Sequence, residues 1–297
     1  MSSDSRNPAW AFVLPVIAVM IWSLNIVVTR YAADLISPVS ISFYRWLIAF
    51  LILTPFMLGK VWEQRQLIMQ HWLQLAVLSA FGMVLYQGLA YTAAHYTTAT
   101  NMGLINAFIP VFTILVSFFI LKDIPNRFAI MGSILSFCGL IYVMAQGNLS
   151  ALWQSGAHWG DLLMVVAVFF YAFYGVFLKK WQLKIPLLIS LYIQIAFALI
   201  YHLPFIAWLG LDSLNTANLG SVLYAGIFPS LIAPFVWMLA VQQIGPNRTS
   251  IFMNLMPVFT AIIASLWLAE SWTIYHTLGG VLILTGVVMA QKKTCRT

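Results

Sequence analysis

The segment Asn106-Ala-Phe-Ile-Pro110-Val-Phe-Thr113 returns later in the chain as Asn254-Leu-Met-Pro257-Val-Phe-Thr260. Aligning the two prolines gives an offset of 147 residues, and the same offset pairs Asp123 with Glu270, Gly132 with Gly279, and Gly139 with Gly286. Near the start of each half an offset of 149 pairs Trp10 with Trp159, Trp22 with Tyr171, Arg30 with Lys179, and Arg45 with Gln194. Because the matches are colinear, they predict two related halves.

The composition indicates an integral membrane protein. The 297 residues are 62% hydrophobic and only 7% charged, and their mean hydropathy is +0.94. An average soluble domain is about 25% charged. A soluble fold with so few charges could not cover its surface, so the lipid bilayer is the expected solvent.

The apolar runs predict an all-α protein of ten transmembrane helices. A membrane-spanning helix needs about 20 mostly apolar residues, so this length has room for roughly ten. We expect the helices approximately at 10–29, 38–58, 72–92, 98–121, 127–146, 159–178, 186–209, 219–243, 249–269 and 275–291. The first repeat is then 1–147, the connecting loop 148–157, and the second repeat with a short basic tail 158–297.

Five helices in each half is an odd number, so the second half must enter the membrane from the opposite face. This arrangement is an inverted-topology repeat, related by a pseudo-two-fold axis in the membrane plane. Two similar halves can rock about a central site and open it to each side in turn.

The basic residues predict the orientation. Positively charged residues gather in the cytoplasmic loops of membrane proteins. Twelve of the 14 lysines and arginines fall on the side of the N-terminus: Arg6, Lys60, Arg65, Lys122, Arg127, Lys179, Lys180, Lys184, Arg248, Lys292, Lys293 and Arg296. This side is predicted to be cytoplasmic. The chain is then a multi-pass protein of the cell (inner) membrane with both termini in the cytoplasm. Because the charges lie in short loops, they indicate topology and not nucleic-acid binding.

The ordered motifs resemble a known family. They are Trp22-Ser-Leu-Asn25, Tyr44-Arg45-Trp-Leu-Ile-Ala49, the two Pro-Val-Phe-Thr blocks, and the acidic turns Leu121-Lys-Asp123 and Leu268-Ala-Glu270. Together, over residues 10–291, they resemble the EamA-type units of the drug/metabolite transporter (DMT) superfamily. The resemblance implies a ten-helix metabolite transporter. The first four helices of each half would line a central cavity, and the fifth, at 127–146 and 275–291, would be peripheral.

Arg45 is the foremost candidate for substrate binding. It lies about two helical turns inside its predicted helix, where a charged side chain is costly unless it is compensated. A guanidinium can bind a substrate carboxylate through two hydrogen bonds. It can equally be a structural anchor, bonded to loop carbonyls or extended to the membrane interface.

Further candidates are uncharged polar and aromatic residues within the apolar runs. Amides both donate and accept hydrogen bonds without carrying charge, and deep aromatic rings suit an apolar or cationic group. The candidates are Trp22, Asn25, Tyr86, Gln87, Tyr91, Asn106, Tyr171, Tyr174, Trp237 and Asn254. Interhelical hydrogen bonding is the alternative role of the amides, and it is favoured for Asn101; general packing is the alternative role of the aromatic rings. Pro110 and Pro257 are expected to kink their helices, either passively or to free carbonyls at a binding site.

Several chemistries find no support in the sequence. There is no Walker phosphate loop, no cluster with metal-ligand spacing and no implied cofactor. The histidines are scattered without partners, which argues against a membrane enzyme acting on lipid-linked substrates. No carboxylate lies near the middle of a predicted helix, although proton-coupled carriers commonly use one. We therefore expect facilitated exchange, or coupling through a group that the sequence does not identify.

The sequence thus predicts a transporter that exports or exchanges small metabolites, such as aromatic or amphiphilic amino acids, by alternating access. The alternative is an efflux carrier for drugs or cations. A channel or a lipid-modifying enzyme is less favoured. The expected partners are the lipid bilayer and a small-molecule substrate, and the chain is expected to be a monomer or a homodimer.

Overall fold

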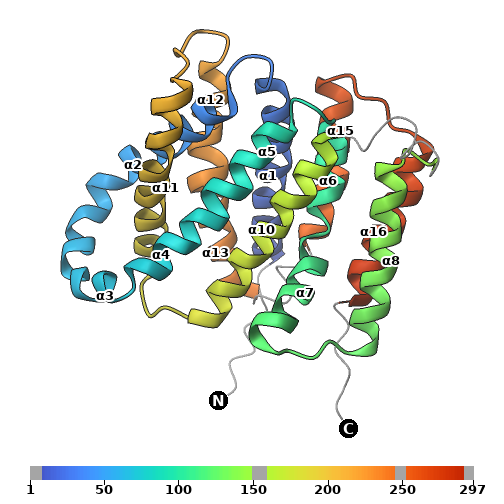
Figure 1. Ribbon diagram of the computed structural model, residues 1–297, viewed down its shortest axis with the longest axis horizontal. Coiled ribbons are helices and arrows are strands. Elements are labelled where there is room, and N and C mark those ends of the chain that lie inside the picture. Colours follow the sequence, from blue (N-terminus) through green and yellow to red (C-terminus); the bar gives the residue numbers. More distant parts are fainter. Residues whose placement is uncertain (1–8, 149–158, 245–251, 291–297) are drawn as a thin grey trace.

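The computed structural model describes residues 9–148, 159–244 and 252–290, and helices make up most of these ranges (Figure 1). The basic tail and all of the predicted connecting loop except Asn148 lie outside the described residues. Helices satisfy their backbone hydrogen bonds internally, which is what a bilayer requires of a spanning segment. The predicted all-α membrane class is confirmed.

Within the described ranges, eight helices are long and apolar enough to cross a membrane. They are Trp10–Ala32, Pro38–Glu63, Trp72–Ala93, Ala99–Leu121, Arg127–Met144, Trp159–Trp181, Leu187–Leu209 and Leu219–Ala240. Two shorter apolar helices follow, Met256–Trp267 and Ile274–Ala290. Each of these ten overlaps one of the predicted segments.

Shorter elements subdivide several of these helices. The first part of the chain contains η1 (Ala9–Phe12), α1 (Val13–Ala32), α2 (Pro38–Glu63), α3 (Arg65–Gln70), α4 (Trp72–Ser79), η2 (Ala80–Leu85), α5 (Tyr86–Ala93), α6 (Ala99–Asn106), α7 (Ile109–Leu121) and α8 (Arg127–Met144). The second contains α10 (Trp159–Trp181), α11 (Leu187–Leu209), α12 (Leu219–Ile227), η3 (Phe228–Ile232), α13 (Ala233–Ile244), η4 (Phe252–Leu255), α15 (Met256–Trp267) and α16 (Ile274–Ala290).

Local sequence explains where the helices begin and end. The side chains of Ser37, Thr98 and Asn126 each accept a hydrogen bond from the backbone N–H three residues on, which caps α2, α6 and α8. Such caps satisfy donors that the first turn of a helix leaves unpaired. Helix α7 ends at Leu121, and the next residue, Lys122, has a left-handed backbone conformation with a φ of 57°.

Four helical spans are interrupted at their centre or start. The π-helical turns η2 and η3 separate α4 from α5 and α12 from α13. A turn at Ala107 and Phe108 separates α6 from α7, and the 3-10 turn η4 precedes α15. Pro110 and Pro257 are the second residues of α7 and α15, so each proline stands where a helix restarts after irregular backbone.

Loops gather at the two ends of the bundle (Figure 1). We call face B the end with the loops at 33–37, 94–98, 210–218 and 268–273. Face A is the end with the short helix α3 and the loops at 122–126 and 182–186. The main apolar core lies between α1, α5, α6, α10 and α15, around Phe108, Ile105 and Met164.

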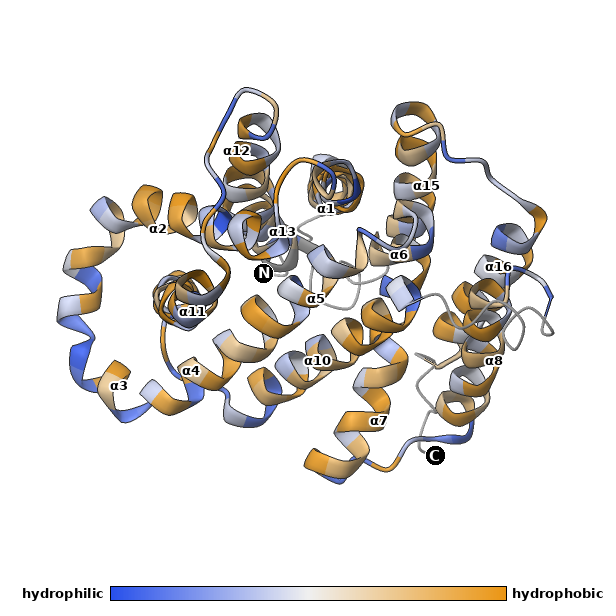
Figure 2. Ribbon diagram, turned by 45° about the horizontal axis from the view of Figure 1, so that its top comes forward, coloured by the Kyte–Doolittle hydropathy of each residue, from blue (hydrophilic) through white to orange (hydrophobic). Residues whose placement is uncertain are grey.

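The outer surface is apolar. Figure 2 shows hydrophobic residues along the length of the helices, with hydrophilic ones concentrated in loops and helix ends. Large side chains such as Phe56, Phe119 and Leu266 are between 67% and 84% exposed. A soluble monomer rarely exposes so much apolar surface to water, whereas a membrane protein exposes it to lipid. Trp62, Trp159 and Trp208 lie exposed near helix ends, as an interfacial aromatic belt requires.

Helices α8 and α16 pack against each other as a pair to one side of the bundle (Figure 1). Glycines form their contact. A Cβ atom on Gly132 would lie 2.4 Å from the carbonyl oxygen of Gly286, and one on Gly139 would lie 2.8 Å from that of Gly279. The two backbones therefore touch directly, as small residues permit between membrane helices. The predicted peripheral helices thus pack within one chain.

This contact gives a first prediction. Gly286→Ala places a methyl group 2.5 Å from backbone atoms of Gly132 and Ser136, so the helices must separate. We expect a loss of about 1–3 kcal/mol in unfolding free energy, measured by thermal unfolding in detergent. Gly88→Ala in α5 is the matched control, because its methyl group would meet nothing within 4 Å. Equal stability of the two variants would contradict the close packing.

Candidate functional site

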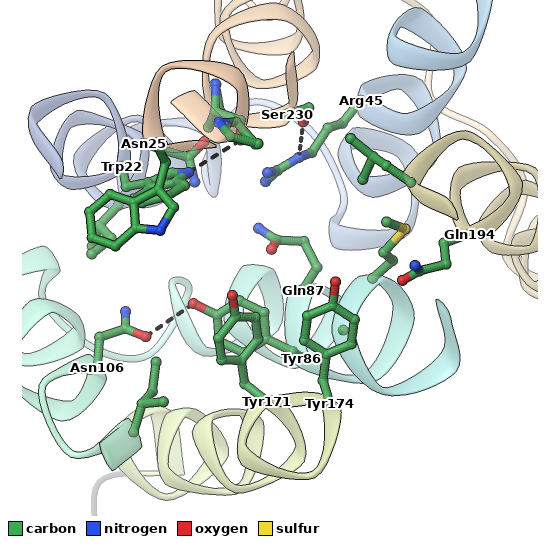
Figure 3. A pocket seen from close by; sticks show the side chains of 18 of the residues that line it. Trp22, Asn25, Arg45, Tyr86, Gln87, Asn106, Tyr171, Tyr174, Gln194 and Ser230 are labelled. Carbon is green, nitrogen blue, oxygen red and sulfur yellow. Dashed lines mark hydrogen bonds between the residues drawn. The ribbon is translucent and has the colours of Figure 1, made fainter. Parts of the chain in front are cut away.

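A cavity of about 480 Å³ lies at the centre of the bundle (Figure 3). Its wall is built from α1, α2, α10 and α11 and from the four interrupted spans. Nine predicted site residues line it: Trp22, Asn25, Arg45, Tyr86, Gln87, Asn106, Tyr171, Tyr174 and Trp237. Since they come from distant parts of the sequence, the fold brings the candidates together as one site.

Arg45 is buried in the cavity wall, with 5% of its surface exposed. Its Nε donates a 2.7 Å hydrogen bond to Ser230 Oγ, and its Nη1 donates a 3.3 Å bond to the hydroxyl of Tyr91. Ser230 Oγ in turn donates to the carbonyl oxygen of Ala225 at 2.7 Å. The serine proton is thus directed away, and the oxygen lone pairs face the guanidinium.

A close approach of two helices explains the Arg45–Ser230 pair. Gly226 of α12 faces α2, where a Cβ atom would lie 2.8 Å from the Ile48 side chain and 3.3 Å from the Arg45 carbonyl oxygen. The π-helical turn η3 follows directly and carries Ser230. π-helical turns often occur at functional sites, because the extra residue redirects side chains.

Arg45 is the one charged residue among the described lining residues. The ion pairs found in the described ranges lie at helix ends and loops: Arg30 with Asp34, and Lys179 with Asp123. An arginine keeps its charge in a protein. The central cavity therefore carries a positive charge without a carboxylate beside it.

Aromatic rings form much of the remaining wall. Tyr86 and Tyr171 have ring centroids 4.6 Å apart, and Tyr171 and Tyr174 have centroids 5.5 Å apart. On the other side, the rings of Trp22 and Trp237 lie 5.4 Å apart. The wall is thus largely aromatic, and Figure 3 shows the hydroxyl groups of Tyr171 and Tyr174 pointing into the cavity.

Amide groups add neutral polar contacts. Asn106 Oδ1 accepts a 3.0 Å hydrogen bond from the Tyr86 hydroxyl. Gln194 Nε2 donates to Ser190 Oγ at 2.9 Å. The Gln87 amide makes no side-chain hydrogen bond to the described residues, and Figure 3 shows it extending toward the guanidinium of Arg45. Asn25 Oδ1 is likewise a buried acceptor without a partner in those ranges.

Two predicted residues are not among the described lining residues. Tyr91 is buried behind the wall and contacts the site through Arg45. The side chain of Asn254 lies outside the described residues. Among the lining residues that were not predicted, Ser230 and Gln194 carry a hydroxyl and an amide group. Gln194 had a signal, its pairing with Arg45 at an offset of 149, whereas Ser230 had none.

A second polar cluster lies at face B, apart from the cavity. Asp161 is fully buried there; Asn101 Nδ2 donates to both of its carboxylate oxygens at 3.2 Å, and the Thr97 hydroxyl donates as well. Asn101 Oδ1 also contacts His276 Nε2 at 3.3 Å. Asn101 thus makes hydrogen bonds to two other helices, the role that the sequence favoured for it.

Glu270 and Asp212 bind helix starts at the same face. The Glu270 carboxylate accepts from the backbone N–H groups of Ala99 and Thr100, at 2.8 and 3.0 Å, at the beginning of α6. Asp212 accepts from the Ser37 N–H at 2.6 Å, beside the start of α2. This N–H lowers the pKa of Asp212, which stays ionised at neutral pH, and the contact weakens as the pH falls through the carboxyl range.

A helical bundle that is apolar outside and hollow within is a multi-pass membrane protein with an internal cavity. The sequence matches the EamA-like transporter family twice, over residues 9–145 and 158–291. The chain therefore belongs to the EamA-like transporter family, within the drug/metabolite transporter superfamily.

Proteins with similar sequences are also named transporters. An uncharacterized transporter of Archaeoglobus fulgidus is 28% identical over 283 residues, which cover 93% of this chain and 96% of that protein. The uncharacterized transporter YyaM of Bacillus subtilis is 24% identical over 266 residues, covering 88% and 87%. A solved crystal structure of a protein 16% identical in sequence superposes with a TM-score of 0.63 over 95% of this chain and 96% of its own, so the fold is shared.

The buried carboxylate gives a second prediction. Asp161→Asn replaces an acceptor by an NH₂ group that faces the donors of Asn101 and Thr97. We expect a loss of about 1–3 kcal/mol in unfolding free energy, because a buried donor loses its acceptor. Asp123→Asn removes only the exposed ion pair with Lys179, so a change of about 0–1 kcal/mol is expected there. Equal effects in thermal unfolding would show that the face B cluster does not stabilise the fold.

Proposed function

We propose that this protein is a carrier that exports or exchanges small metabolites, such as aromatic or amphiphilic amino acids, by alternating access around the central cavity. It has ten membrane-spanning helices in two inverted repeats, residues 1–147 and 158–297, joined by residues 148–157. The cavity carries the proposal, since its wall is contributed by equivalent positions of the two repeats.

The equivalence is visible among the lining residues. An offset of 149 relates Trp22 to Tyr171, Asn25 to Tyr174 and Arg45 to Gln194, and all six line the cavity. An offset of 147 relates Asn106 to Met253 and Ile109 to Met256, which line it too. A site on a pseudo-two-fold axis receives matching positions from each repeat, as alternating access requires.

Backbone features repeat in the same way. The π-helical turns η2 and η3 begin 148 residues apart, at Ala80 and Phe228. The left-handed residues Lys122 and Ala269 are 147 apart. Pro55 inside α2 and Pro204 inside α11 are 149 apart. Such irregularities are rare in helices, so their recurrence supports duplication of one unit.

The glycine contacts between α8 and α16 also fit a two-fold axis. The sequence offset makes Gly132 equivalent to Gly279 and Gly139 equivalent to Gly286. The contacts join Gly132 to Gly286 and Gly139 to Gly279. Exchanging equivalent residues converts one contact into the other, which is what a two-fold axis between the helices predicts. This seam within the chain favours a monomer.

Different closures at the two faces support alternating access. Asp161, Asp212 and Glu270 of the second repeat bind the first repeat at face B. Toward face A, Leu187 and Met238 line both the central cavity and a second cavity that includes Lys60 and Glu63. In this proposal face A is cytoplasmic, the conformation is closed at face B, and those three carboxylates separate from their partners when it opens there.

Other functions fit the cavity less well. An enzyme would need an acid, base, metal or nucleophile in reach of one another, and the described lining residues include no carboxylate, histidine or cysteine. The absence of a lining carboxylate in those ranges also favours exchange without proton coupling. Saturable counterflow would distinguish a carrier from a channel.

Counterflow in proteoliposomes tests the carrier. Vesicles loaded with an unlabelled aromatic amino acid, such as L-phenylalanine, should accumulate the labelled compound transiently. Asn25→Ala, Tyr86→Ala and Asn254→Ala should each reduce the rate, about tenfold if one hydrogen bond or ring contact is lost. Tyr142→Ala is the control, because α8 does not contribute to the described cavity wall. Wild-type rates in all three variants would remove the proposed site.

Membrane topology is tested separately. Lys60 follows the second predicted helix and Lys180 the sixth, so the inverted repeat places both at the cytoplasmic face. Reporter fusions after each residue should therefore report the same compartment. Opposite compartments would exclude five spans per repeat, whatever the transport assay shows.

A further inference from the structure

We propose that the central cavity selects substrates that carry a carboxylate, and that the Arg45 guanidinium binds it. The substrate class is an amphiphilic carboxylate, with or without an amino group, and organic cations are excluded. The inference rests on the proposed function of this cavity as the transport site. It decides between the metabolite carrier and the cation-efflux alternative.

The hydrogen bonds of Arg45 leave one edge of the guanidinium for a ligand. Five N–H groups are available on an arginine side chain. One, on Nε, binds Ser230 and a second, on Nη1, binds Tyr91. Three remain, and they belong to the two terminal nitrogens. A carboxylate accepts two parallel N–H bonds from such a pair of nitrogens.

The charge of Arg45 has no structural counterpart in the other repeat. Gln194, at the equivalent position, is neutral and is held by Ser190 within its own helix. The architecture therefore does not need a charge at this depth. A structural anchor would explain the bonds to Ser230 and Tyr91, but it would not explain why the terminal nitrogens line a cavity.

Electrostatics then decides the sign of the ligand. A buried charge in a low-dielectric site is stabilised by an opposite charge and destabilised by a like one. Among the described residues of the wall no carboxylate neutralises Arg45. An anionic group entering the cavity supplies that missing charge, whereas an organic cation adds a second positive charge.

The rest of the wall fits an apolar body on the ligand. The rings of Tyr86, Tyr171 and Tyr174 stand across the cavity from Arg45 in Figure 3, with the Gln87 amide between them. The ring faces accommodate an aromatic or aliphatic chain, and the amide can accept from or donate to a substituent near the carboxylate. The volume of about 480 Å³ suits a metabolite of ordinary size.

Matched probes test this class on the purified full-length protein. The first pair is 3-phenylpropanoate and 2-phenylethylamine, which differ in the charged group; L-phenylalanine carries both groups. Octanoate and octylamine form an aliphatic pair. Each compound is titrated while the thermal unfolding midpoint is followed, since a ligand of the native state raises it. The carboxylates and L-phenylalanine should raise the midpoint, and the two amines should not.

Variants of the arginine locate the effect. Arg45→Gln should weaken carboxylate binding roughly tenfold to hundredfold, because hydrogen bonds to a charged group are lost. Arg45→Lys should keep part of the affinity, since it retains the charge without the planar pair of donors. Arg30→Gln is the control, because Arg30 lies at face B in an exposed ion pair with Asp34.

Outcomes of two kinds overturn the inference, one with the wild type and one with the variant. One is an amine that binds as tightly as its matched carboxylate, or the failure of both carboxylates to bind the wild type. The other is full carboxylate affinity in Arg45→Gln. The wild-type comparison stands even if the variant does not fold. Carboxylate binding without counterflow would contradict the carrier but keep the site, whereas counterflow of a cation would contradict the site but keep the carrier.

Discussion

In hydrocarbon, every backbone N–H and C=O group must find a partner inside the protein, and this constraint determines where the chain can depart from a helix. The π-helical turns and the break between α6 and α7, which interrupt three of the described spans, border the cavity. Gly82 and Met83 belong to η2, Pro229 and Ser230 to η3, and Asn106 precedes the turn before α7. Irregular backbone at membrane depth is tolerated where it lines an interior space, so the geometry of the cavity and the breaks in the helices have one physical cause.

The same constraint explains what the sequence could predict. Long apolar runs leave few alternatives to a spanning helix, so the segments were predictable from hydropathy alone. The cavity residues were predictable because a polar or aromatic group deep in an apolar run needs a protein or aqueous environment. Ser230 could not be predicted in this way, because serine is common in membrane helices. The direction of its side chain depends on the π-helical turn η3, which no local sequence pattern predicts. The buried cluster around Asp161 could not be predicted either, because its partners Thr97 and Asn101 are 64 and 60 residues away in the sequence.

The chemistry of the site divides between two kinds of side chain. Tyrosine and tryptophan rings from both halves form much of the cavity wall, and two of them, Trp22 and Tyr171, occupy equivalent positions. Arg45 breaks that equivalence, since its counterpart is a neutral glutamine. Family membership accounts for the shared fold, whereas the charge of the cavity depends on one particular side chain, Arg45.

The glycine seam between α8 and α16 has a mechanical consequence. Where backbone touches backbone, no side chains are available to repack when the helices shift, so the seam can twist or slide but cannot widen without losing its contacts. The seam joins the two halves along one margin of the bundle, opposite α2 and α11 in Figure 1, where the halves also pack against each other. In the proposed alternating access, a small rotation of the halves about this seam would displace the opposite margin most. Helices α2 and α11 would then move farther than the other helices.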